Sequence, residues 1–170
     1  QEMKKVQEIG QKDEKDEDES NEAEKIKIKR LLNSRCFLDF SKELQENVKT
    51  VLTQKKDKSV KKIEIESETI NHLYDTNSLN SSDFISILRY FDEIVINVNS
   101  PSKTSMFIIN TISNIKMKSL PKIEFNLFIT GTEIKDNEYS NQNMINKVDI
   151  GNTVVTIGEG AFRRCSSLKQ

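Results

Sequence analysis

The sequence is short of the residue types on which several function classes depend. Its two cysteines, Cys36 and Cys165, cannot hold 170 residues together as a disulfide scaffold. The single histidine, His72, leaves no histidine cluster for a zinc site or a Ser–His–Asp arrangement. No apolar run approaches the roughly 20 residues that a membrane-spanning helix needs. We therefore expect no metal, no cofactor, no catalytic residues and no transmembrane segment.

Apolar residues are also scarce in this chain. They make up 35% of the sequence against 31% charged residues, and the mean hydropathy is −0.61. This composition is more polar than that of an average globular domain but is not polar enough for complete disorder. The length fits a single domain or a piece of a longer protein.

The formal net charge of −1 conceals three blocks of different charge. Residues 1–24 carry a net charge of −6, residues 25–62 carry +8 and residues 63–170 carry −3. The first block includes eight consecutive charged residues at 12–19. Such a stretch buries too little apolar surface to offset the entropy cost of ordering. We predict a disordered or transiently helical charged tail over 1–24.

A basic helical segment is predicted over 25–59. Ile26 and Ile28 alternate with lysines, which indicates either a short strand or the start of a helix. A helix capped by Ser41 or Asp39 is indicated further on by apolar residues at intervals of three and four, Phe40, Leu44, Val48, Val51 and Leu52. A nucleic-acid binder would add stacking aromatics or a recognisable module to such a basic segment. Neither is present, so nucleic-acid binding is not expected.

A strand-like pattern recurs four times in residues 60–170. The pattern aliphatic-x-x-aliphatic-x-aliphatic begins at Val60, Phe91, Leu120 and Ile145, and each match heads a run with period-2 alternation. Helix-like stretches at 81–91 and 105–117 separate the strands, although the spacing is irregular. A cycle of strand, loop and helix over about 20–30 residues is the unit of a leucine-rich-repeat solenoid. The sequence thus predicts an α/β solenoid of about four coils.

The last 26 residues carry a more specific motif. Its features are Ile157-Gly158, Gly160-Ala161-Phe162, Cys165 and Leu168, after a strand at 145–150. This run closely resembles the BspA-type leucine-rich repeat, a 23-residue unit, although Gly151 stands where that family usually has proline. The resemblance is clear over 145–170 and weaker over 60–144. A further unit would open at Leu168, so we expect a repeat array that is truncated at residue 170.

The repeat pattern predicts which side chains form the core. Gly158 and Gly160 permit a tight turn, and Cys165 is expected to be a buried small hydrophobe rather than a reactive thiol. The predicted repeat core consists of Ile63, Ile65, Ile94, Ile96, Ile123, Phe125, Val148, Ile150, Ile157, Phe162, Cys165 and Leu168.

The same register predicts columns of side chains on the exposed strand face. Equivalent positions of stacked parallel strands lie about 4.8 Å apart. A mostly basic column is expected from Lys62, Glu93, Lys122 and Lys147, and a mostly acidic one from Glu64, Val95, Glu124 and Asp149. A third column follows with Glu66, Asn97, Asn126 and Gly151. These columns form either a solvated surface or a partner-binding face.

We hypothesise a non-catalytic module that binds another protein through this concave strand face. The BspA resemblance implies adhesion or recognition at the cell surface, because members of that family bind host or extracellular ligands. The residues alone leave the location open, with the cytoplasm as the alternative. A regulatory intracellular scaffold is the second hypothesis, and a nucleic-acid binder acting through 25–62 is the third and weakest.

Overall fold

The strands of this fold are all paired in parallel within the described residues. The computed structural model describes residues 21–54, 57–114 and 123–169. A four-stranded parallel sheet has the order β1-β2-β3-β5, formed by Lys62–Glu66, Glu93–Asn99, Ile123–Ile129 and Ile145–Ile150. A second parallel pair joins β4 (Glu133–Ile134) to β6 (Thr156–Ile157). The predicted α/β class with parallel strands is thereby confirmed.

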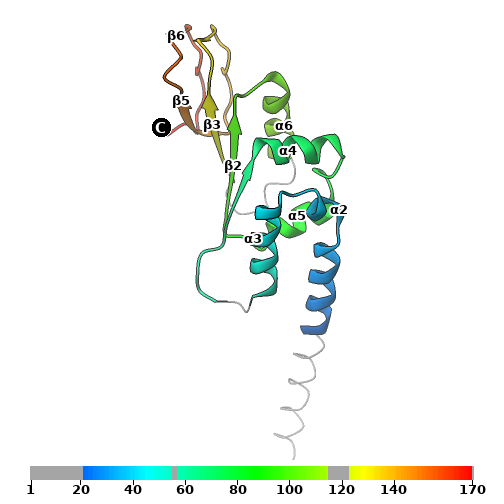
Figure 1. The fold of residues 1–170 in the computed structure, drawn as a ribbon. Helices are drawn as coiled ribbons and strands as arrows, with labels where there is room; N and C mark the ends of the chain where they lie inside the picture. Colours follow the sequence, from blue (N-terminus) through cyan, green and yellow to red (C-terminus); the bar gives the residue numbers. More distant parts are fainter. Residues whose placement is uncertain (1–20, 55–56, 115–122, 170) are drawn as a thin grey trace, which may run out of the picture.

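Helices cover one side of this sheet (Figure 1). Helical residues 21–32 are followed by α2 (Arg35–Leu38), α3 (Lys42–Thr53), α4 (Ser67–Asp75), α5 (Ser82–Leu88) and α6 (Lys103–Asn114). Ser34, Ser41 and Ser81 begin α2, α3 and α5, since each hydroxyl accepts a hydrogen bond from a backbone N–H of the first turn. Of the two caps predicted for α3, the structure uses Ser41. The segment with Ile26 and Ile28 is helical, and residues 1–20 of the predicted tail lie outside the described residues.

The sequence analysis did not predict α4, the helix that carries His72. In the structure β1 ends at Glu66 and α4 begins at Ser67 with no turn between them. Ile70 and Leu73 are buried on the inner side of α4. No glycine, proline or other turn residue marks this boundary, which is why the helix was overlooked.

The register of the first three strands agrees with the repeat pattern. Ile63 lies opposite Ile94, which lies opposite Ile123, and the next inward row is Ile65, Ile96 and Phe125. All six side chains are at most 6% exposed and belong to one hydrophobic core shared with the helices. Complete burial of such side chains stabilises a fold by about 1.5–3 kcal/mol each.

The predicted register of the fourth strand is wrong. Val148 was expected opposite Ile123 but lies opposite Leu127, while Ile145 occupies the place opposite Phe125. The pairing shifts at Asn146, whose side-chain Oδ1 accepts a hydrogen bond from the backbone N–H of Phe125 at 3.0 Å. The Asn146 side chain thus takes the place of a backbone acceptor, and the residues of β5 after it pair with β3 in a shifted register.

One turn nevertheless occurs twice, with a spacing of 23 residues. Asn137 and Gly160 both have positive φ angles, 57° and 67°, and so do Asn141 and Arg164, at 64° and 60°. Between these turns the rings of Tyr139 and Phe162 stack with centroids 5.6 Å apart. The turn that follows β4 is therefore repeated, residue for residue, after β6.

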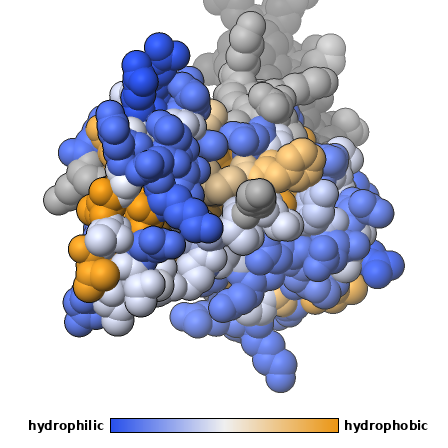
Figure 2. Space-filling view, turned by 90° about the horizontal axis from the view of Figure 1, so that it is seen from above, coloured by the Kyte–Doolittle hydropathy of each residue, from blue (hydrophilic) through white to orange (hydrophobic). Residues whose placement is uncertain are grey.

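The exposure of side chains on β5 and β6 corrects part of the predicted core. Ile150 and Ile157 were expected to point inward, yet they are 41% and 55% exposed, and Val155 beside β6 is 80% exposed. Val148, Phe162, Cys165 and Leu168 are only half-buried. Ile134 on β4 lies opposite Ile157 and is 2% exposed, because β6 covers it. Figure 2 shows hydrophobic surface on the side where Figure 1 places β5 and β6.

Candidate interaction site on the strand face

The sheet face that the helices leave uncovered is a candidate site built from alternate strand residues. Because successive side chains of a strand point to opposite faces, the inward apolar rows impose an outward polar set. Its members are Lys62, Glu64, Glu66, Glu93, Val95, Asn97, Asn99, Glu124, Asn126, Phe128, Lys147 and Asp149.

A ladder of side-chain hydrogen bonds crosses three strands of this face. The amide nitrogen of Asn97 donates to Glu66 Oε1 at 3.1 Å, and the amide nitrogen of Asn126 donates to Asn97 Oδ1 at 3.4 Å. Asn99 donates to the other oxygen of Glu66, also at 3.4 Å. Glu66 precedes α4 but makes no side-chain cap bond to it. Its carboxylate instead accepts hydrogen bonds on the sheet face, and these bonds hold the side chains of the ladder in defined positions.

This ladder row changes in charge from one edge of the sheet to the other. The register continues Glu66, Asn97 and Asn126 with Lys147 on β5. An anionic group at one end and a cationic group at the other are thus separated by two amides. Such a row can bind an extended peptide with charges of opposite polarity.

Carboxylates dominate the part of the face nearest the amino ends of β1, β2 and β3. Glu64, Glu93 and Glu124 are exposed there, and the Lys62 ammonium lies 2.9 Å from Glu64. The hydrogen bond and charge of Glu64, with smaller contributions from Glu93 and Glu124, raise the pKa of Lys62. Among the described residues of this corner one cation faces three anions, a balance that is complementary to a basic partner.

The predicted columns are brought together in part. The pairs Lys62–Glu93, Glu64–Val95 and Val95–Glu124 stand opposite each other as expected, and so do Glu66, Asn97 and Asn126. Lys122 lies outside the described residues. The shift in β5 moves Lys147 and Asp149 out of the predicted columns. Lys147 faces Asn126, where Gly151 was expected, and Asp149 faces Phe128.

Two apolar side chains interrupt the polar face. Val95 is only 6% exposed because it stands on a central strand between Glu64 and Glu124, whose longer side chains flank it. Phe128 is 43% exposed and lies beside Asp149. An exposed aromatic among fixed polar groups is a typical anchor in a protein interface. The sequence analysis did not select Phe128, because the predicted columns ended at Asn126, two residues earlier on the same strand.

A cleft borders the β1 edge of this face. It has a volume of about 420 Å³ and lies between the amino-terminal half of α3 and β1. Ser41, Glu43 and Asn47 line its α3 side, and Glu64 and Glu66 line its β1 side. The amide of Asn47 donates to the backbone carbonyl of Lys62 at 3.4 Å, which joins the cleft to the strand edge. The candidate site therefore extends from β5 to α3.

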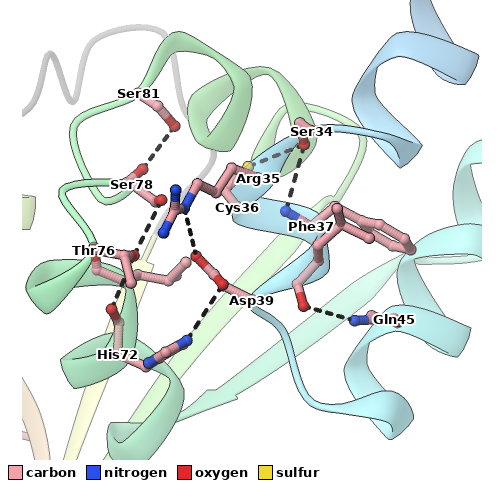
Figure 3. A network of polar contacts seen from close by, with 12 residues as sticks. Ser34, Arg35, Cys36, Phe37, Asp39, Gln45, His72, Thr76, Ser78 and Ser81 are labelled. Atoms are coloured by element: carbon pink, nitrogen blue, oxygen red, sulfur yellow. Dashed lines mark hydrogen bonds and ion pairs between the residues drawn. The ribbon is translucent and has the colours of Figure 1, made fainter.

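A separate polar network joins the amino-terminal helices to α4 (Figure 3). The Asp39 carboxylate lies 3.3 Å from His72 Nε2 and 3.9 Å from Arg35 Nε. Figure 3 also shows Cys36 beside Ser34, with their Sγ and Oγ atoms 3.3 Å apart. Burial raises the pKa of the Cys36 thiol, which keeps it neutral and unreactive. The contacts of Asp39 with Arg35 and His72 link α2 to α4, so the network has a structural role.

The described residues contain no group of three or more His, Cys, Asp and Glu side chains that could hold a metal ion. Cys165 donates to the backbone carbonyl of Tyr139 at 3.1 Å, and so lies in the repeat turn. Among the helices over 21–54, 57–114 and 123–169, none has the length and apolar character to cross a bilayer.

Comparison with known proteins assigns no relative to this fold. No protein-family model, curated protein or solved structure matches the chain.

Proposed function

We propose that this chain is a non-catalytic protein-binding module whose coils stack as a leucine-rich-repeat solenoid of BspA type. The parallel strands, and the turn repeated after 23 residues with matching φ angles, support the stacked-coil description. The polar strand face binds a segment of another protein. Extracellular recognition follows from the family resemblance and rests on it alone.

The observation that carries the proposal is the hydrogen-bonded order of the exposed strand face. Side chains that are fixed before binding lose less conformational entropy on contact with a partner. The ladder from Glu66 to Asn126 and the ion pair of Lys62 with Glu64 provide this order. The excess of carboxylates among the described residues near the amino ends of β1–β3 supports a partner segment that carries lysine or arginine.

A phage-displayed library of random peptides, selected on the full chain, tests this proposal. We expect enriched peptides to be basic, and the double variant Glu64→Lys/Glu124→Lys should weaken their binding about tenfold or more. The matched control is Glu46→Lys/Glu68→Lys, which reverses two exposed carboxylates on α3 and α4. Peptides that bind both double variants equally well, or a selection that enriches none, would contradict binding through the strand face.

Labelling of intact cells that make the protein separates its two candidate settings. A surface protein is modified by a membrane-impermeant reagent alongside a surface marker, whereas an intracellular scaffold is protected like a cytosolic marker. Binding of a single-stranded RNA with a steep salt dependence would support the nucleic-acid alternative. Against it, Arg30 and Lys61 of the basic segment already pair with Asp83 and Asp57, at 2.6 and 2.8 Å.

A further inference from the structure

An apolar groove lies between helical residues 21–32 and the carboxy-terminal half of α3. Its volume is about 700 Å³. Ile28 and Leu32 form one side of its floor, and Phe37 and Leu52 complete the floor. Ile28 and Leu32 are only partly buried, so the groove leaves apolar surface open to solvent.

Helical residues 21–32 are attached to the rest of the fold by contacts outside this floor. Leu31 is completely buried in the core. Arg30 forms an ion pair with Asp83 at 2.6 Å, and the Tyr90 hydroxyl donates to the Glu24 carboxylate. These contacts fix the helix beside α3, so the groove is a permanent feature of the packing.

The groove follows the length of the helix. The residues that line it from this side are Asn21, Glu24, Lys25, Ile28, Lys29 and Leu32. Their spacing of three and four follows one face of the helix through about three turns, or about 18 Å. The shape of the groove therefore matches an elongated occupant.

The two walls of the groove favour a helical occupant over an extended one. Both walls are helices, whose backbone groups already pair within each helix. An extended peptide would leave backbone N–H and C=O groups unpaired on the apolar floor, whereas a helix pairs these groups internally. A helix with apolar side chains at i, i+3, i+4 and i+7 would cover the floor.

The rim of the groove is positively charged. Lys25 and Lys29 line it from the helix, and Lys49 lines it from α3. Glu24, the acidic residue in the lining, already accepts the hydrogen bond from Tyr90. Lys25 pairs with Glu22 at 3.6 Å, but both side chains are largely exposed and such a pair contributes little.

Other polar side chains of the lining bond to their own helices. The Asn33 amide donates to the carbonyl of Lys29 at 2.9 Å, and the Thr53 hydroxyl donates to the carbonyl of Lys49 at 2.7 Å. The lysine ammonium groups are thus the charged groups that an occupant meets beside the floor. Acidic side chains on both flanks of an apolar helix face would complement them.

We propose that this groove binds an amphipathic helix of another protein, with Asp or Glu beside its apolar face. Apolar side chains of the partner helix contact Ile28, Leu32 and Phe37, and its carboxylates lie near Lys25 and Lys29. The groove is complementary to an acidic partner and the strand face to a basic one, so the two surfaces select different partners. This inference does not depend on the function proposed for the strand face.

A phage-displayed library of helices, selected on the full chain, tests the proposal. Each member presents one helix on a fixed scaffold, with apolar residues kept at i, i+3, i+4 and i+7 and the flanking positions randomised. We expect enriched helices to carry Asp or Glu at the flanking positions. A selection that enriches no helix, or that enriches helices without acidic flanks, would overturn the proposal.

Double charge reversals locate the bound helix. Lys25→Glu/Lys29→Glu should weaken binding of the enriched helices about tenfold or more. Two matched variants should bind them like the parent chain: Lys42→Glu/Lys135→Glu, which reverses two exposed lysines outside the groove, and Glu64→Lys/Glu124→Lys on the strand face. Equal binding to the parent chain and to Lys25→Glu/Lys29→Glu would place the helix elsewhere and overturn the proposal.

A charge exchange separates direct contact from loss of folding. Enriched helices whose flanking carboxylates are replaced by lysine should bind the parent chain weakly and regain affinity for Lys25→Glu/Lys29→Glu. An unfolded variant cannot produce this recovery, and its absence would overturn the contact. Sedimentation equilibrium tests a second copy as the occupant: self-association of the parent chain that Lys25→Glu/Lys29→Glu abolishes would also overturn the proposal.

Discussion

The side-chain amide of Asn97 donates to the carboxylate of Glu66 across 3.1 Å, and the two residues face each other in the register of β2 and β1. The amide oxygen of Asn97 also accepts the hydrogen bond from Asn126 on β3. One asparagine therefore connects three strands on the exposed face. Its contribution is electrostatic as well as geometric, since its donor faces an anion.

Replacement of Asn97 by aspartate should destabilise the fold. Asn97→Asp removes the donor and sets a carboxylate opposite Glu66, so we expect the free energy of unfolding to fall by about 1–2 kcal/mol. Urea unfolding at neutral pH measures this loss. Much of it should vanish below about pH 4, where carboxylates become protonated. The control Asn152→Asp, at an exposed turn, should change stability little; equal losses in the two variants would contradict the ladder.

Two isoleucines in equivalent positions should respond differently to the same substitution. Ile134 on β4 is 2% exposed and its partner Ile157 on β6 is 55% exposed. Ile134→Thr should cost about 2–3 kcal/mol because it leaves a cavity and buries a hydroxyl. Ile157→Thr should stay within about 0.5 kcal/mol of the parent chain. Urea unfolding of both variants makes the comparison, and a large loss at Ile157 would show that its edge is covered in solution.

Gly158 should be the least replaceable glycine of the repeat turn. A Cβ atom there would clash with the backbone nitrogen of Asp136, in the turn that follows β4. Gly158→Ala must therefore push the two turns apart, and we expect a loss of about 2–3 kcal/mol or more. At Gly131 nothing lies within 4 Å of an added Cβ, so Gly131→Ala should cost only the strain of φ 107°, about 1 kcal/mol. The reverse order in thermal unfolding would contradict close stacking.

Strand positions were predictable where apolar and polar residues alternate clearly and turn residues mark the ends of the elements. Ile63, Ile94 and Ile123 sit in period-2 runs, and their parallel register follows the repeat pattern. Gly160 indicated a turn and has a φ of 67°. Both kinds of feature are local, because they depend on residues within a few positions of one another.

The remaining features depend on contacts that sequence patterns do not encode. The shift in β5 arises because the Asn146 side chain takes a backbone hydrogen bond of Phe125, which no alternation pattern reveals. Ile157 fits an inward pattern, yet its burial requires a further strand beside β6, and among the described residues none lies there. The strand-face columns were accordingly predicted for β1 to β3 and misassigned on β5.

The stacked pair of Tyr139 and Phe162 should make stability fall at high pH. Tyr139 is 4% exposed, and its burial, with a smaller contribution from the charge of Glu138, raises its pKa to about 12 from an ordinary value of 10.0. Because the folded state keeps a proton that the unfolded chain releases above pH 10, the free energy of unfolding falls as pH rises from 10 toward 12. The stabilisation is complete below that window.

The variant Tyr139→Phe isolates this effect. It retains the stacked ring but cannot ionise, so its stability should decline less between about pH 8 and pH 11, by about 1–1.5 kcal/mol relative to the parent chain. Taking the difference between the two proteins cancels the other high-pH groups, including Cys36 and Tyr90, whose pKa values burial also raises. Urea unfolding at both pH values supplies the measurement. Parallel pH profiles for parent and variant would show that the Tyr139 hydroxyl ionises freely in the folded protein.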